Sequence, residues 1–140
     1  MSQEEKLQTL VAQMKLYEAY LNDILAREST ITRLMEEARL AVEAIKNISG
    51  HDTIQTLMPI GIGVYMQTST SPTNKLLISI GSGVAIEKSR DDAVIYIETR
   101  LKEMEAALRS MLSQKQEIAN RMEQVRTEVN ATLQKTQKSG

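Results

Sequence analysis

The sequence has no cysteine, phenylalanine or tryptophan, and its four tyrosines are its only aromatic residues. Without cysteine the chain can form no disulfide, no thiolate metal site and no cysteine nucleophile. Its single histidine, His51, excludes a metal site built on several histidines. Large rings supply much of the burial in compact cores, so this chain must bury medium-sized aliphatic side chains instead. The seam between helices meets that need better than a thick core.

No charge of one sign dominates either, since 17 basic residues oppose 18 acidic ones along 140 residues. Nucleic-acid binding needs a basic stripe, so we expect no nucleic-acid partner. No apolar run approaches the roughly 18 residues of a membrane span, and the polar first residues are unlike a secretory signal. We therefore expect no membrane partner and a cytoplasmic protein, in keeping with the lack of cysteine.

Glycine and proline are absent from residues 4–48 and 91–137 and gather between them. Residues 49–90 hold both prolines and five of the six glycines. Because these two residue types interrupt helices, the pattern predicts two long helices around a turn-rich insert. We interpret residues 1–140 as a single domain of these three parts.

Both helical segments carry an apolar heptad repeat. With position a at residues 7, 14, 21, 28, 35 and 42, and d three residues later, eleven of the twelve positions are apolar. With a at residues 94, 101, 108, 115, 122 and 129, ten of twelve are apolar. Six uninterrupted heptads in each segment predict a long antiparallel two-helix coiled coil, in which facing residue numbers sum to about 139.

Two charged residues interrupt the seam, Glu28 and Lys115, and they fall in adjacent layers of this register. One interpretation is that they contact each other and set the register of the coil at some cost in stability. The other is that both charged groups extend to water along their aliphatic stems.

The insert reads as four short strands in two hairpins. Its first strand runs from Ile54 to Met58 and is closed by Pro59, and its second runs over Ile62–Thr68. The third and fourth, Leu76–Ile80 and Val84–Glu87, flank a Gly-Ser-Gly turn. Isolated hairpins are marginal in water and have unpaired edges that recruit partners. We expect them to pair between subunits, through Ile54, Leu57, Ile62, Val64, Met66, Leu76, Ile78, Ile80, Val84 and Ile86.

The helix ends next to the insert carry capping signals. Gly50 can supply the left-handed residue that ends the first helix. Ser89 precedes two acidic residues and is a candidate N-cap of the second helix.

A long antiparallel coil interrupted at its bend by two hairpins resembles prefoldin, and specifically the alpha-class subunits of archaeal prefoldin. The stretch Leu57-Met58-Pro59-Ile60-Gly61-Ile62-Gly63-Val64-Tyr65 is similar to the first hairpin of that family. A beta-class subunit has one hairpin and a shorter insert, so the 42-residue insert favours the alpha class.

The resemblance implies a hexamer of two alpha and four beta subunits, whose hairpins form intersubunit β-barrels. It implies an ATP-independent holding chaperone that captures unfolded proteins, prevents their aggregation and delivers them to a group II chaperonin. No cofactor and no metal are implied.

The free end of the coil is the candidate client-binding site. Apolar residues outside the seam are available there, and methionine and fraying seam residues adapt to varied shapes. The candidate residues are Leu7, Leu10, Val11, Met14, Leu16, Tyr17, Tyr20, Met122, Val125, Val129 and Leu133. The alternative for all of them is that they only close the last heptads.

Other functions remain open to different degrees. In an adaptor, the hairpins would dock into a larger complex and the coil would be a spacer. An RNA-binding arm would need more than the mild basic bias of the last twenty residues. An enzyme is not expected, because the two Gly-x-Gly triplets do not continue into phosphate-binding motifs, and His51 beside Asp52 has no nucleophile next to it.

Overall fold

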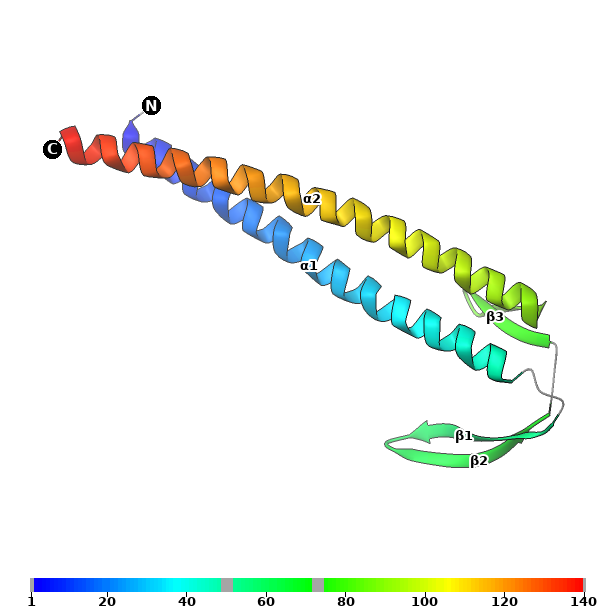
Figure 1. Ribbon diagram of the computed structural model, residues 1–140. Coiled ribbons are helices and arrows are strands. Elements are labelled where there is room, and N and C mark those ends of the chain that lie inside the picture. The colour runs from blue at the N-terminus through cyan, green and yellow to red at the C-terminus, as the bar shows by residue number, and fades with distance from the viewer. Residues whose placement is uncertain (1, 49–51, 72–74, 140) are drawn as a thin grey trace. The chain divides into compact units, whose positions relative to one another are not determined.

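The computed structural model describes residues 2–48, 52–71 and 75–139. The fold is predominantly α with a small β part, as predicted. Both helices begin and end within two residues of the predicted bounds. Gly50 and His51 lie outside the described residues. In chain order, coloured in Figure 1, the elements are α1 (Gln3–Asn47), β1 (Ile54–Gly61), β2 (Val64–Thr70), β3 (Lys75–Gly81), β4 (Val84–Ser89) and α2 (Arg90–Ser139).

Each helix begins at a serine cap. The N–H of Glu5 donates a hydrogen bond to Oγ of Ser2, and the N–H of Asp92 donates one to Oγ of Ser89, both at 3.1 Å. These bonds satisfy N–H groups that the first turn of a helix leaves without partners. The predicted cap at Ser89 is confirmed, and since Ser89 also ends β4, the second hairpin continues directly into α2.

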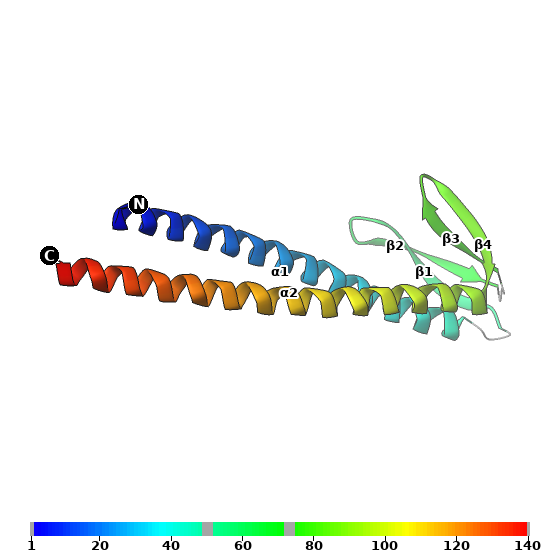
Figure 2. The ribbon, with the colours of Figure 1, turned by 90° about the horizontal axis from the view of Figure 1, so that it is seen from above.

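Residues 2–33 and 104–139 pack as an antiparallel helix pair. Figure 2 shows the two segments running in opposite directions, with both chain ends at the same end of the pair. The buried residues here, Leu10, Ile24, Val125 and Thr132, all occupy predicted d positions. Oγ1 of Thr136 donates a 2.8 Å hydrogen bond to Oε1 of Gln3. That contact lies in the predicted register.

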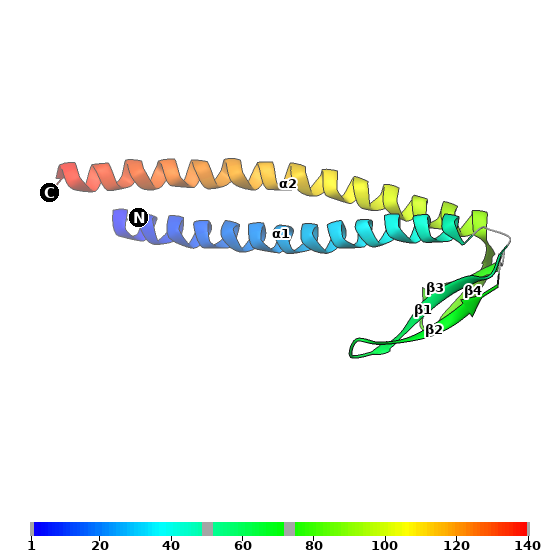
Figure 3. The ribbon, with the colours of Figure 1, turned by 60° about the horizontal axis from the view of Figure 1, so that its bottom comes forward.

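Residues 34–103 contain the two hairpins, seen as separate two-stranded ribbons in Figure 3. β1 pairs with β2 and β3 with β4, both antiparallel, as predicted. The predicted strand ends are wrong in the first hairpin. Pro59 lies inside β1, opposite Tyr65, because in a two-stranded sheet the missing N–H can face outward. β2 starts at Val64, because Ile62 and Gly63 form the turn.

The half of the first hairpin away from its turn is held by polar side chains. Nε2 of Gln55 donates a 3.0 Å hydrogen bond to Oγ of Ser69 across the strands. Oγ1 of Thr56 is in hydrogen-bond contact with the hydroxyls of Thr68 and Thr70. Cross-strand pairs of this kind stabilise antiparallel ribbons. The hairpin is therefore polar at one end and apolar toward its turn.

Candidate functional site

Four candidate client-binding residues are exposed on the distal end of the coil, which we define as residues 2–20 and 119–139. Val11, Leu16, Tyr20 and Leu133 have exposed fractions of 45 to 50%. They lie outside the seam, so closing the coil does not cover them. An apolar surface at this end is what binding to apolar client segments would need.

The seam members of the candidate set are covered to a greater degree. Leu10 and Val125 are buried, and the others are half-buried in the closed coil: Leu7, Met14, Tyr17, Met122 and Val129. These side chains already pack between the helices. A client could reach them fully only after the helices part, so the four exposed residues are the available surface of the closed coil.

One flank of the coil extends this apolar surface. Val11 and Leu133 occupy heptad position e, and so do Leu25 and Leu112, whose side chains are 47% and 62% exposed. In an antiparallel pair the e positions of both helices line one flank. Sequence reasoning missed Leu25 and Leu112 because it considered only the terminal heptads. The heptad assignment already places both leucines at position e, outside the seam.

The opposite flank, formed by g positions, is mostly polar. Arg27 forms an ion pair with Asp23, and Arg121 forms one with Glu117 at 3.3 Å. The hydrogen bond to Glu117, and then that to Tyr17, raises the pKa of Arg121 above its ordinary value, so this guanidinium stays charged. A cavity of about 280 Å³ on this flank is lined by Tyr20, Asp23, Ile24, Arg27, Gln114, Glu117 and Ile118. Tyr20 is therefore an exposed aromatic side chain beside charged and polar groups and the seam residues Ile24 and Ile118.

The two charged seam residues contact each other. Nζ of Lys115 donates a 3.1 Å hydrogen bond to Oε2 of Glu28 and lies 2.9 Å from Oε1. Oε1 is buried and accepts no hydrogen bond among the described residues. Both side chains are about three-quarters covered. The contact excludes the interpretation in which both groups extend separately to water, while a role in setting the register stays a prediction.

The predicted assembly residues divide by exposure. Ile54, Leu76, Ile78 and Ile86 are half-buried. The others are exposed: Leu57, Ile62, Val64, Met66, Ile80 and Val84. Sequence reasoning missed four exposed apolar neighbours in the same strands, namely Met58, Ile60, Tyr65 and Leu77. Every strand is also an edge strand, so unpaired backbone groups accompany this apolar surface.

The start of α2 carries a smaller aromatic and charged cluster. The guanidinium of Arg100 lies 5.4 Å from the ring centre of Tyr96, which is cation–π distance. The hydrogen bond to the hydroxyl of Tyr96 is the main cause that raises the pKa of Arg100. Arg100 also contacts Glu103 at 3.8 Å. These contacts are local to the helix surface.

Within the described residues no group of three or more histidine, cysteine or acidic side chains could hold a metal ion. No helix there is long and apolar enough to cross a membrane. Both Gly-x-Gly triplets form hairpin turns. Their backbone reverses the chain direction between β1 and β2 and between β3 and β4.

Comparison with known proteins bears on the whole chain. The family model for prefoldin subunits matches residues 4–135. The prefoldin subunit alpha of Nitrosopumilus maritimus is 41% identical over 140 residues, which cover 100% of this chain and 96% of the relative. The prefoldin beta subunit of Thermococcus strain KS-1 has a similar fold, with TM-score 0.63 and 12% identity over 91% of this chain and 92% of that one. Filamentous prefoldin of Methanocaldococcus jannaschii matches with TM-score 0.57 and 18% identity, over 89% and 98%.

Proposed function

Because the chain belongs to the prefoldin family and matches its alpha subunits, we propose that it is a subunit of an ATP-independent holding chaperone. In this proposal it assembles through its hairpins with two-helix beta-type partners, as two alpha and four beta subunits. The distal end captures unfolded proteins in the cytoplasm and delivers them to a group II chaperonin. The observation that carries the proposal is the exposed apolar surface at that end of an otherwise closed coil.

The hairpins support the assembly part of the proposal. Two-stranded sheets are marginal alone, and the two described here expose large apolar side chains together with free edges. Pairing with strands of other subunits would satisfy the edges and bury the apolar residues in one step. A closed intersubunit barrel leaves no edge exposed.

The distal end supports the client-binding part. Val11, Leu16, Tyr20 and Leu133 offer separate apolar contacts on the surface. Each contact alone is weak, which suits a surface that must release many different clients. Several coils acting together would raise the overall affinity through a high effective concentration. Hydrophobic contact needs no nucleotide, in keeping with the proposed ATP independence. The two Gly-x-Gly triplets form hairpin turns.

An adaptor remains the second candidate function. A spacer needs a satisfied seam, which this coil has, and it needs hairpins that dock. It does not need exposed apolar side chains at the distal end or along the e flank. Those residues therefore favour the chaperone over the spacer, and their substitution separates the two functions.

The test is suppression of aggregation of a chemically unfolded protein by the purified complex. Replacing Val11→Gln together with Leu133→Gln removes two exposed aliphatic contacts without touching the seam. We expect the concentration needed for half-suppression to rise about fivefold, which corresponds to roughly 1 kcal/mol of lost contact. Unchanged suppression would favour the adaptor.

A matched control comes from exposed leucines outside the distal end. Leu34 and Leu40 are 41% and 55% exposed on α1. Leu34→Gln with Leu40→Gln makes the same chemical change away from the proposed client surface. We expect half-suppression at the wild-type concentration. A loss equal to that of the distal variant would mean that general surface hydrophobicity, and no particular site, holds the client.

A further inference from the structure

The exposed apolar side chains of the coil segments 2–33 and 104–139 gather on one flank. Among the described residues of these segments, six large apolar side chains are exposed, and four of them occupy heptad position e: Val11, Leu25, Leu112 and Leu133. The other two, Leu16 and Tyr20, lie at positions c and g. The e positions of both helices line the same flank of an antiparallel pair. The e flank is therefore the side of the coil on which an apolar ligand finds most contact.

Polar and small residues divide the e flank into two apolar clusters. The distal cluster is Val11 with Leu133, and the inner cluster is Leu25 with Leu112. Their residue numbers sum to 144 and 137, close to the 139 of facing residues, so each cluster draws on both helices at one level of the coil. The e positions between the clusters are all exposed, and they hold Glu18, Ala119 and Arg126.

The separation of the clusters sets the spacing that a ligand must have. Val11 and Leu25 are fourteen residues apart, and Leu112 and Leu133 are twenty-one. These separations correspond to about 21 Å and about 32 Å along a helix, with a mean of about 26 Å. An extended chain covers about 26 Å in roughly eight residues. Since alternate residues of an extended chain point the same way, an even spacing places both apolar groups on the side that faces the coil.

The pattern does not suit a further helix or a permanent partner subunit. A third helix packed along the flank would meet an e residue about every 10 Å, and between Val11 and Leu25 it would meet the carboxylate of Glu18. Four half-exposed aliphatic side chains also offer less than half of the ~800 Å² that each partner contributes to a stable interface. An extended segment needs apolar contact only where its own apolar residues fall. It fits the flank and can be released.

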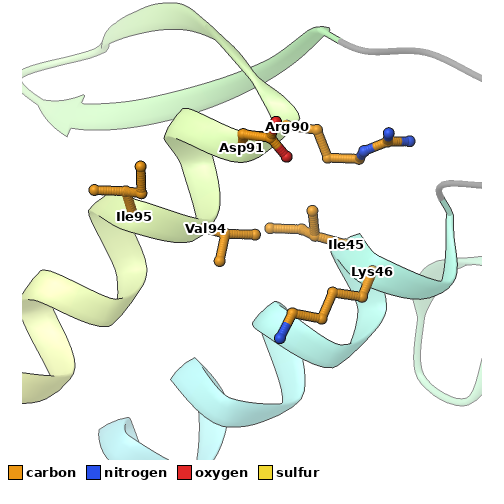
Figure 4. A pocket seen from close by; sticks show the side chains of 6 residues that line it. All are labelled: Ile45, Lys46, Arg90, Asp91, Val94 and Ile95. Carbon is orange, nitrogen blue, oxygen red and sulfur yellow. The ribbon is translucent and has the colours of Figure 1, made fainter.

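The aliphatic hollow near the insert has no such pair of clusters. It measures about 390 Å³ and is lined by Ile45, Lys46, Arg90, Asp91, Val94 and Ile95. Figure 4 shows Ile45 and Val94 directed toward each other, while the charged ends of Lys46 and Arg90 point away from them. Its aliphatic lining is a single cluster among charged residues. Ile95, which is 60% exposed there, therefore provides a control for the e flank.

We propose that the e flank binds one extended client segment at both clusters, and so selects segments whose apolar groups are about eight residues apart. The inference rests on the proposed function, because it assumes that this coil captures unfolded chains, and it adds which segments are captured best. Binding at one cluster raises the effective concentration of the same segment at the other. The polar residues of the segment then lie over Glu18, Ala119 and Arg126.

The test compares two peptides of identical composition. Each carries two Leu-Ser-Val groups among Gln, Ser and Thr residues, and the groups are eight residues apart in one peptide and three in the other. A photo-crosslinking amino acid in place of Asn22, an exposed b position beside the gap, reports peptide bound to this coil alone. In the purified complex we expect half-maximal crosslinking of the eight-residue peptide at about one-fifth of the concentration, because the shorter spacing cannot span both clusters. Equal concentrations would overturn the proposal.

Variants of the inner cluster test its part in this preference. Leu25→Gln with Leu112→Gln leaves only the distal cluster, so the two peptides should bind equally. Ile95→Gln removes an exposed aliphatic side chain outside the e flank, and the fivefold preference should remain. A preference that survives loss of the inner cluster, or that is lost in the control, would contradict the proposal.

Filling the gap gives the opposite change. Glu18→Leu with Arg126→Leu places apolar side chains about 10 Å from their neighbours on each helix, so the three-residue peptide should bind as tightly as the eight-residue peptide. An undiminished preference would count against the proposal. Suppression of aggregation by the wild-type complex tests the proposed function separately. If suppression is seen while both peptides bind the wild-type coil equally, the proposed function stands and the two-cluster inference fails.

Discussion

Lys115 and Glu28 form an ion pair inside the helix seam, with Nζ of the lysine 2.9 Å from Oε1 and 3.1 Å from Oε2 of the glutamate. The pair joins α1 and α2 within the segments 2–33 and 104–139. Charged pairs in a seam are seldom the most stable solution, and their best-attested use is to select one register. The contact therefore leads to a prediction about both stability and uniqueness.

Replacing either partner alone, Glu28→Leu or Lys115→Leu, should destabilise the coil by about 1–2 kcal/mol, because a mostly covered charge is left without its partner. Replacing both should recover that loss, so the cycle should show a coupling energy of about 1 kcal/mol or more. Urea unfolding of the four proteins measures these values. Additive effects would mean that the pair contributes no specific interaction.

If the pair sets the register, the double leucine variant should also lose uniqueness. Crosslinks between cysteines introduced in facing layers would then appear in shifted registers as well as in the native one. A single native set of crosslinks in that variant would show that the remaining seam sets the register alone.

Ala93 is the most deeply buried of the core residues, with an exposed fraction of 1%. Replacing Ala93→Leu enlarges a side chain at a site that is almost fully covered and should destabilise the protein by about 1–3 kcal/mol. Ala106, an exposed residue of α2, provides the control. Ala106→Leu should change the free energy of unfolding by less than about 0.5 kcal/mol. Equal effects at the two sites would show that residue 93 is not packed as described.

Ser89 ends β4 and caps α2 through its 3.1 Å hydrogen bond with the N–H of Asp92. Ser89→Ala should therefore cost about 1 kcal/mol. In the helix interior the same change removes no cap, so Ser110→Ala should leave stability unchanged or raise it slightly. Thermal unfolding followed by circular dichroism compares the two. Unchanged stability of the Ser89→Ala variant would show that the cap does not stabilise the junction between β4 and α2.

The e flank predicts how far client contact extends from the distal end. Val11 and Leu25 are fourteen residues apart on α1, or about 21 Å, which an extended client segment of about six residues spans. Leu25→Gln with Leu112→Gln should raise the half-suppression concentration about twofold, less than the distal pair, because fewer clients reach that far. No change would confine client contact to the distal end.

Much of the fold follows from local pattern. Six heptads without glycine or proline predict each helix to within two residues, and Ser89 before two acidic residues predicts the start of α2. The strand ends of the first hairpin were not predicted correctly, because a proline such as Pro59 usually ends a strand and an isoleucine such as Ile62 usually lies within one. In a two-stranded ribbon both tendencies are overridden, since an edge strand accepts proline and the turn forces Ile62 to positive φ.

The candidate surfaces were predictable where they depend on position in the heptad. Val11 and Leu133 lie outside the seam and are exposed, as their positions require. The two apolar faces of β1–β2 were not foreseen. The predicted strand began at Ile62, so Tyr65 was not considered as the cross-strand partner of Pro59. Had the turn been assigned to Ile62 and Gly63, the cross-strand pairs would have shown that both faces of β1–β2 are apolar.

The most direct test of the account is native mass spectrometry of the complex purified from its own cells through a tag on this chain. If the chain is the proposed chaperone subunit, we expect a six-chain assembly with two copies of this chain and four of a smaller coiled-coil protein. A homodimer, or a single copy inside an unrelated large complex, would contradict it.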